Sequence, residues 1–152
     1  MLFFIVRMKV KVLQRSRILR YDGSFSGLSA FLLCPSPVLA DSETADIRGD
    51  GEMTQAGADI TLTYREEESG ASVTVEKKGD TLTVMRGGAR LVFRLGEKTA
   101  FTYRTAYGEL PTEAYTDALT LQKKGSAMLI CLSYVAVFGG MAQRNEMRFK
   151  IT

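Results

Sequence analysis

The sequence predicts an all-β protein that forms a single antiparallel barrel of about 8–10 strands. Short segments of alternating apolar and polar residues follow one another from residue 73 to residue 107, with only glycine-containing breaks between them. The 152 residues are 45% hydrophobic and 24% charged, so we expect one soluble domain over residues 1–152. Closure into a barrel would remove the two exposed edges of an open sheet. A two-sheet sandwich shows the same alternation and remains the alternative fold.

The N-terminal region predicts one strand. Residues 1–7 are expected to be an extension, because Met8 is a second candidate start. Lys9–Leu19 alternate well enough for a strand, with apolar side chains on one face and basic side chains on the other.

Residues 22–50 predict an irregular excursion between the first and second strands. They begin with a turn signal, contain Pro35 and Pro37 and show little periodicity, apart from a short helical turn expected around residues 27–33. The end of the excursion is open, since residues 44–53 also fit a strand.

The remaining strands share apolar and polar alternation and are separated by short turns. We expect them at 59–64, 72–76, 81–86, 90–95, 101–107, 112–122 and 127–138, with a last strand containing residues 146–151 after Gly139-Gly140. In the strand 112–122 the expected apolar set is Tyr115, Leu119 and Leu121. The strand 127–138 is apolar on both faces, so it is expected either to pack against the excursion or to form a subunit contact.

Composition excludes several kinds of site. The chain has no His, which removes the commonest side chain for acid–base catalysis and for binding transition metals, so we expect no metal and no cofactor. Cys34 and Cys131 are isolated and match no metal or redox spacing, which indicates free thiols in a reducing compartment.

Positive charge gathers in the first strand, although the net charge of the whole chain is only +3. The basic side chains there are Lys9, Lys11, Arg15, Arg17 and Arg20. No aromatic stacking platform accompanies them, so an exposed strand face is favoured over a nucleic-acid site.

The expected location is the cytoplasm. The opening apolar residues, 1–6, are too short to span a membrane. The alternative is export, with residues 28–40 as the apolar part of a signal, because arginines precede this run and Ala40 ends it. Asp22 and the two prolines argue against that alternative.

One part of the chain resembles a known family. It comprises Leu82-Thr83-Val84-Met85-Arg86-Gly87-Gly88, then Phe93, then the string from Tyr103 to Leu110, with Thr116 following. These residues resemble the YwiB-like family, domain of unknown function 1934, and the likeness extends over residues 51–152. It implies a calycin-like (lipocalin-like) barrel from a bacterial cytoplasmic protein, and no activity, because none is established for the family. The chain departs from the family pattern in residues 1–7 and around residues 25–40.

Arg86 is the first candidate site residue. Alternation places it on the same side as Leu82 and Val84, and a cation that faces a barrel interior needs a partner. The functional interpretation is an anion or carboxylate site at the barrel mouth, with Tyr103, Thr105 and Tyr107 as further hydrogen-bonding groups. The structural interpretation, which we favour, is an arginine that closes one end of the barrel. Glu66-Glu67-Glu68 predict a solvated turn in which nothing pairs with the acids.

These features predict a protein that is not an enzyme and whose barrel binds a small apolar or amphipathic molecule. The alternative is an interaction or scaffold protein that acts through its surface or as a homodimer. It is suggested by the two-sided strand 127–138 and by the apolar residues 28–39.

Overall fold

The computed structural model describes residues 5–106 and 108–152, and for residues 103–105 it describes the backbone only. In that part of the chain there are ten strands and one short helix. They are β1 (Ile5–Tyr21), α1 (Leu28–Leu32), β2 (Leu39–Ala56), β3 (Asp59–Glu66), β4 (Ser72–Lys78), β5 (Thr81–Arg86), β6 (Ala89–Arg94), β7 (Lys98–Thr105), β8 (Gly108–Lys124), β9 (Ala127–Phe138) and β10 (Met141–Ile151).

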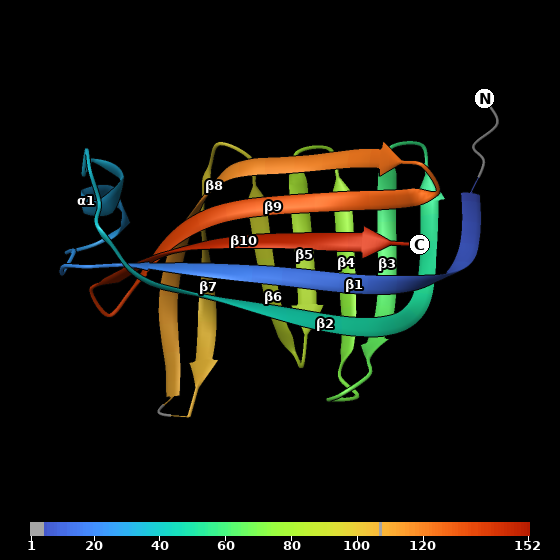
Figure 1. Cartoon of the computed structure of the whole chain (residues 1–152), viewed down its shortest axis with the longest axis horizontal. Coiled ribbons are helices and arrows are strands. Elements are labelled where there is room, and N and C mark those ends of the chain that lie inside the picture. The colour runs from blue at the N-terminus through green and yellow to red at the C-terminus, as the bar shows by residue number, and fades with distance from the viewer. Residues whose placement is uncertain (1–4, 107) are drawn as a thin grey trace.

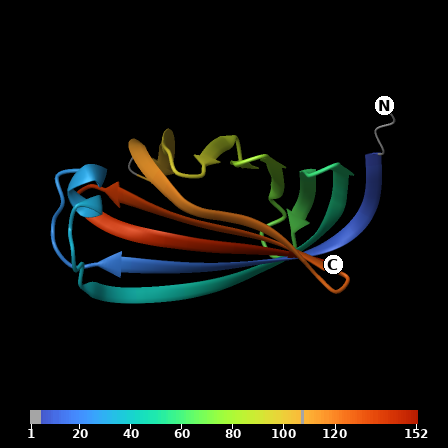
Figure 2. The ribbon, with the colours of Figure 1, turned by 90° about the horizontal axis from the view of Figure 1, so that it is seen from above.

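All ten strands belong to one antiparallel sheet with the order β6-β5-β4-β3-β2-β1-β10-β9-β8-β7. The first and last strands, β1 and β10, pair over Val12–Arg20, which joins the two halves of the chain. The long strands β1, β9 and β10 cross one side of the molecule, and the shorter strands β3 to β7 cross the other side almost at right angles to them (Figure 1). Viewed from above, the two sets form the two layers of a flattened barrel (Figure 2).

The barrel is nearly closed. In the described part of the chain β6 and β7 form no ladder, but Leu95, which follows β6, forms an isolated bridge with Thr116 of β8. There the amide of Gly96 donates to the carbonyl of Thr116 at 2.8 Å, and the amide of Thr116 donates to the carbonyl of Glu97 at 3.3 Å. The predicted all-β antiparallel barrel of about 8–10 strands is therefore confirmed, and the arrangement is consistent with a calycin-like barrel.

The core occupies the space between the two layers. It consists of the inward side chains of every strand, and the largest fully buried ones are Tyr64, Phe93, Phe149, Ile60, Leu62, Leu82, Ile130 and Ile151. Tight turns bring successive strands back into this core. At Gly87-Gly88, for example, both residues have positive φ, 57° and 81°, which suits a two-residue hairpin.

The first two strands are longer than predicted. Residues 5–7, expected as an extension, pair with residues 54–56 as part of β1. The predicted excursion over residues 22–50 is also too long, because β2 begins at Leu39 and only residues 22–38 lie between the strands. The reason is that β2 pairs with β1 throughout but with β3 only from Gly49 onward. Residues 39–48 thus extend along one neighbour and remain mostly exposed, so they carry no apolar alternation.

The outer face of β9 is partly covered, as one of the two predicted alternatives requires. Val135 is buried on that face beneath Leu28 and Phe31 of α1. Tyr115 also packs in this outer cluster, so the predicted set of Tyr115, Leu119 and Leu121 is wrong for its first member. A bulge in β8 between Thr116 and Ala118 shifts the alternation, which places Thr116 inward and Tyr115 outward.

Candidate functional site

Arg86 has the partner that its position requires, and the partner is Glu66. The Nε and Nη2 atoms of Arg86 donate to Oε2 and Oε1 of Glu66 at 2.9 and 2.8 Å. The Ser69 hydroxyl donates to Oε1 of Glu66 at 2.6 Å. The Arg86 guanidinium, followed by the Ser69 hydroxyl, keeps the pKa of Glu66 below its usual range although burial opposes this.

Glu66 was predicted to lie in a solvated turn without a partner, and that prediction is wrong. Its side chain is only 3% exposed, whereas that of Arg86 is 53% exposed. Glu66 is the last residue of β3 and follows Ile60, Leu62 and Tyr64 on the inward face. Continuing that alternation by one step would have identified it.

The ion pair ties the end of β3 to the end of β5. Two donors of the guanidinium are engaged by a carboxylate of the same chain. Tyr103 and Thr105 are on β7, opposite Leu110 and Gly108, but their side chains lie outside the described part of the structure, and Tyr107 lies outside it altogether.

Three polar groups on the inner wall have no hydrogen-bond partner in the described structure. They are the Thr99 hydroxyl, the Thr116 hydroxyl and the Asn145 side-chain Nδ2, and all three residues are more than nine-tenths buried. They lie on β7, β8 and β10, which together with β9 form one end of the strand order. We call these three residues the inner polar patch.

The strand register shows how the residues of the inner polar patch lie relative to one another. Thr116 is opposite Tyr134 on β9, and Tyr134 is opposite Asn145 on β10. Thr99 is opposite Ala114, two residues before Thr116 on the same face of β8. Thr116 and Asn145 therefore flank Tyr134 on the inner wall, and Thr99 lies beyond Ala114 on the next strand.

Aromatic rings lie beside the inner polar patch. Phe93 stacks against Tyr134 with ring centroids 4.5 Å apart, and Phe101 meets Phe93 edge-on at 6.0 Å. On the other side, the Gln143 side-chain amide donates to Oδ1 of Asn145 at 3.5 Å. This wall combines apolar rings with an amide donor and two hydroxyls that have no partner among the described residues.

Sequence reasoning missed the inner polar patch, although one signal was available. Asn145 continues inward the alternation of Met147, Phe149 and Ile151, where an amide stands in place of an apolar residue. Thr116 could not be assigned in this way, because the bulge after it changes the alternation of β8.

A metal site, reactive cysteines or a membrane-spanning helix among the described residues would indicate a different function. Within 5–106 and 108–152, no three Cys, Asp or Glu side chains gather closely enough to hold a metal ion. Both cysteines are free and partly exposed. In the same ranges no helix has the length and apolar character needed to cross a bilayer.

The fold and its inner wall define a class of protein: a small, nearly closed antiparallel barrel with a buried polar patch on its inner wall. The family model described as "Domain of unknown function (DUF1934)" matches residues 39–148, so the chain belongs to that family. Its structure is similar to the crystal structure of the YwiB protein from Bacillus subtilis, with a TM-score of 0.62 and 18% sequence identity over 93% of this chain and 91% of that one. At this identity the similarity concerns the fold alone. No curated protein matches the chain.

Proposed function

We propose that this protein is a non-catalytic binding protein that holds a small amphipathic molecule against the inner polar patch of its barrel. The observation that carries the proposal is the set of three buried polar groups without partners, Thr99, Thr116 and Asn145. A buried polar group left without a hydrogen bond costs about 1–3 kcal/mol, so three of them in one part of the inner wall call for a physical explanation. A bound molecule that satisfies them would remove that cost.

The chemistry of the wall defines the class of ligand. Nδ2 of Asn145 requires an acceptor, such as a carbonyl or hydroxyl oxygen, and the two threonine hydroxyls can donate or accept. The rings of Phe93 and Phe101 provide apolar surface for the remainder of the molecule. Arg86 is not needed as an anchor in this proposal, because Glu66 already engages its guanidinium. Contributions from Tyr103, Thr105 and Tyr107 remain predictions.

The test compares wild-type protein with Thr116→Val by native mass spectrometry directly after purification. Valine has nearly the shape of threonine but offers no hydroxyl, so we expect a small molecule that copurifies with the wild type to be reduced at least several-fold in the variant. Thr120→Val is the matched control, because Thr120 lies on the same strand but faces outward and is exposed. It should retain the molecule.

A filled barrel predicts the opposite pattern. If the unpaired hydroxyl contacts nothing, Thr116→Val removes a buried unsatisfied group and should leave the free energy of unfolding unchanged or raise it by about 1 kcal/mol. A wild type that carries no small molecule, combined with a Thr116→Val variant at least as stable, would refute the proposal.

A second candidate function is a surface contact, including a homodimer, through the tip of the molecule around α1. The apolar residues 28–39, which suggested this alternative, are only partly buried there. The exposed apolar side chains are Leu32, Leu33, Val38, Leu39 and Met141, of which Leu33 is 83% exposed. Light scattering over a range of concentrations tests this candidate, because a monomer at every concentration would remove its support.

A further inference from the structure

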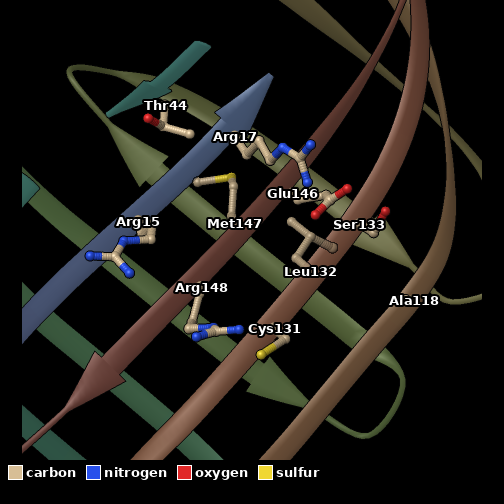
Figure 3. A pocket seen from close by; sticks show the side chains of 10 residues that line it. All are labelled: Arg15, Arg17, Thr44, Ala118, Cys131, Leu132, Ser133, Glu146, Met147 and Arg148. Carbon is tan, nitrogen blue, oxygen red and sulfur yellow. The ribbon is translucent and has the colours of Figure 1, made fainter. Parts of the chain in front are cut away.

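The outer face of the sheet formed by β1, β10 and β9 contains two adjoining hollows. One has a volume of about 390 Å³ and the other about 400 Å³, and both are lined by Arg15 and Arg148. Figure 3 shows the first hollow, in which Arg15 and Arg17 project from β1 and Arg148 from β10. We call the two hollows together the outer basic groove.

Positive charge dominates the outer basic groove. Its cationic side chains are Arg15, Arg17, Lys124, Arg148 and Lys150, and the acid in its lining is Glu146. Arg15 is held by Asp46 on β2, with Nε 2.9 Å from Oδ1. Among the described residues, the other four cations have no carboxylate within salt-bridge distance.

The strand register places like charges together. Arg15 lies directly opposite Arg148, whereas Arg17 lies opposite Glu146. Like charges directly opposite one another destabilise a sheet, and Asp46 offsets only the Arg15 side of this pair. An anion bound between the two guanidinium groups would remove the repulsion, and the planar donors of arginine suit phosphate oxygens.

We propose that the outer basic groove binds a soluble small molecule that carries two or more phosphate groups. The hollows have the size of small-molecule sites. Leu13 and Leu129 in the second hollow provide apolar surface for the part of the molecule that is not phosphate. No aromatic side chain lines either hollow in the described structure, so single-stranded nucleic acid would lack the rings on which bases stack. The groove is on the outer face, so this proposal is independent of the inner polar patch.

The test is a calorimetric titration of the full chain at low salt with pyrophosphate and, separately, with ATP. We expect saturable binding of at least one of them, with a dissociation constant below about 100 μM that weakens as salt is added. Arg148→Gln should weaken binding about ten-fold or more, because it removes a charged hydrogen-bond donor, and Arg148→Lys should recover part of the loss. Arg94→Gln is the matched control, since Arg94 is exposed on β6 away from the groove, and it should bind like the wild type.

Two further arms distinguish other sources of phosphate. Vesicles that contain an acidic phospholipid and a single-stranded oligonucleotide are titrated under the same conditions. Binding of either one without binding of pyrophosphate or ATP would overturn the proposal, as would equal affinities in wild type and Arg148→Gln. Saturable binding of the soluble phosphates that Arg148→Gln weakens and Arg94→Gln does not would establish it.

Discussion

Glu66 illustrates how one buried carboxylate is kept charged in this barrel. It accepts two hydrogen bonds from Arg86 and one from Ser69. Because the pKa of Glu66 is lowered in the folded protein, the interaction contributes stability above the ordinary glutamate value of about 4.3. That contribution begins to decline when the pH falls below the ordinary glutamate pKa. It is lost once the pH has also fallen below the lowered pKa of Glu66 in the folded protein.

Arg86→Gln should therefore destabilise the protein in a pH-dependent way. At neutral pH the variant leaves a buried carboxylate without its cation, and we expect a loss of about 2 kcal/mol, less than for a fully buried pair because Arg86 is half exposed. The gap between wild type and variant should narrow below about pH 4, where the wild type loses its contribution and the variant protonates Glu66. Urea unfolding at several pH values measures this.

Arg90→Gln is the control for Arg86→Gln, since Arg90 is an exposed arginine on the neighbouring strand β6. It should change stability by less than about 0.5 kcal/mol at every pH. A stability gap for Arg86→Gln that is the same at pH 7 and pH 4 would show that the ion pair with Glu66 is not its cause.

At the residue scale, the sequence predicted that Arg86 needs a partner but did not identify Glu66 as that partner. Alternation along β5 placed Arg86 beside Leu82 and Val84 and correctly indicated that it needed a partner. Glu66 was overlooked because three consecutive acids are typical of an exposed turn. For that reason Glu66, the first of them, was not recognised as the last residue of a strand. Thr99 and Asn145 were overlooked because the absence of a hydrogen-bond partner is a property of the packed structure and not of the residue type.

Among the elements, β2 carries the sharpest structural demand. It bends from one layer of the barrel to the other (Figure 1). Gly49 and Gly51 lie directly opposite Glu66 and Tyr64 of β3, where β2 begins to pair with that strand. A Cβ at Gly51 would lie 1.9 Å from the carbonyl oxygen of Thr63 and 2.6 Å from Cα of Tyr64. Both neighbours are backbone atoms in a paired strand, so they cannot move aside without disturbing the ladder.

Gly51→Ala should consequently destabilise the protein by about 3 kcal/mol, at the upper end of the usual cost of overpacking. Thermal unfolding followed by circular dichroism measures the loss. Gly27→Ala is the matched control, because Gly27 has extended backbone and nothing lies within 4 Å of its added Cβ. Equal melting temperatures for the two variants would show that position 51 tolerates a side chain.

At the element scale, the sequence predicted the strands that have one buried face and one solvent-exposed face. Residues 39–43 of β2 were missed, and residues 44–48 were left open as excursion or strand, because Leu39–Arg48 pair with β1 alone and bury little on either face. The face of Tyr115 was missed because a bulge adds one residue to β8, and a single added residue reverses every later position. Neither the one-sided pairing of β2 nor the bulge in β8 can be recognised from the alternation of apolar and polar residues.

For the whole molecule, alternation predicts which side chains face inward but not how the two edges of the sheet meet. The segment after β6 meets β8 through backbone hydrogen bonds between Gly96, Thr116 and Glu97, and Phe93 of β6 packs against Phe101 of β7 and Tyr134 of β9. The barrel is thus held shut mainly by side chains at this seam, where a continuous ladder would use backbone hydrogen bonds.

Phe93→Ala should open this seam selectively. Loss of a fully buried phenyl ring costs about 3–5 kcal/mol, and we expect the amides of Gly96 and Thr116 to exchange with solvent faster than the drop in global stability alone would produce. Phe149→Ala is the matched control, because Phe149 is equally buried but lies on β10 opposite Gln14 and Ile130. It should lower global stability by a similar amount without singling out those two amides. Hydrogen exchange followed by NMR measures both variants, and the same exchange pattern in each would mean that the seam does not depend on Phe93.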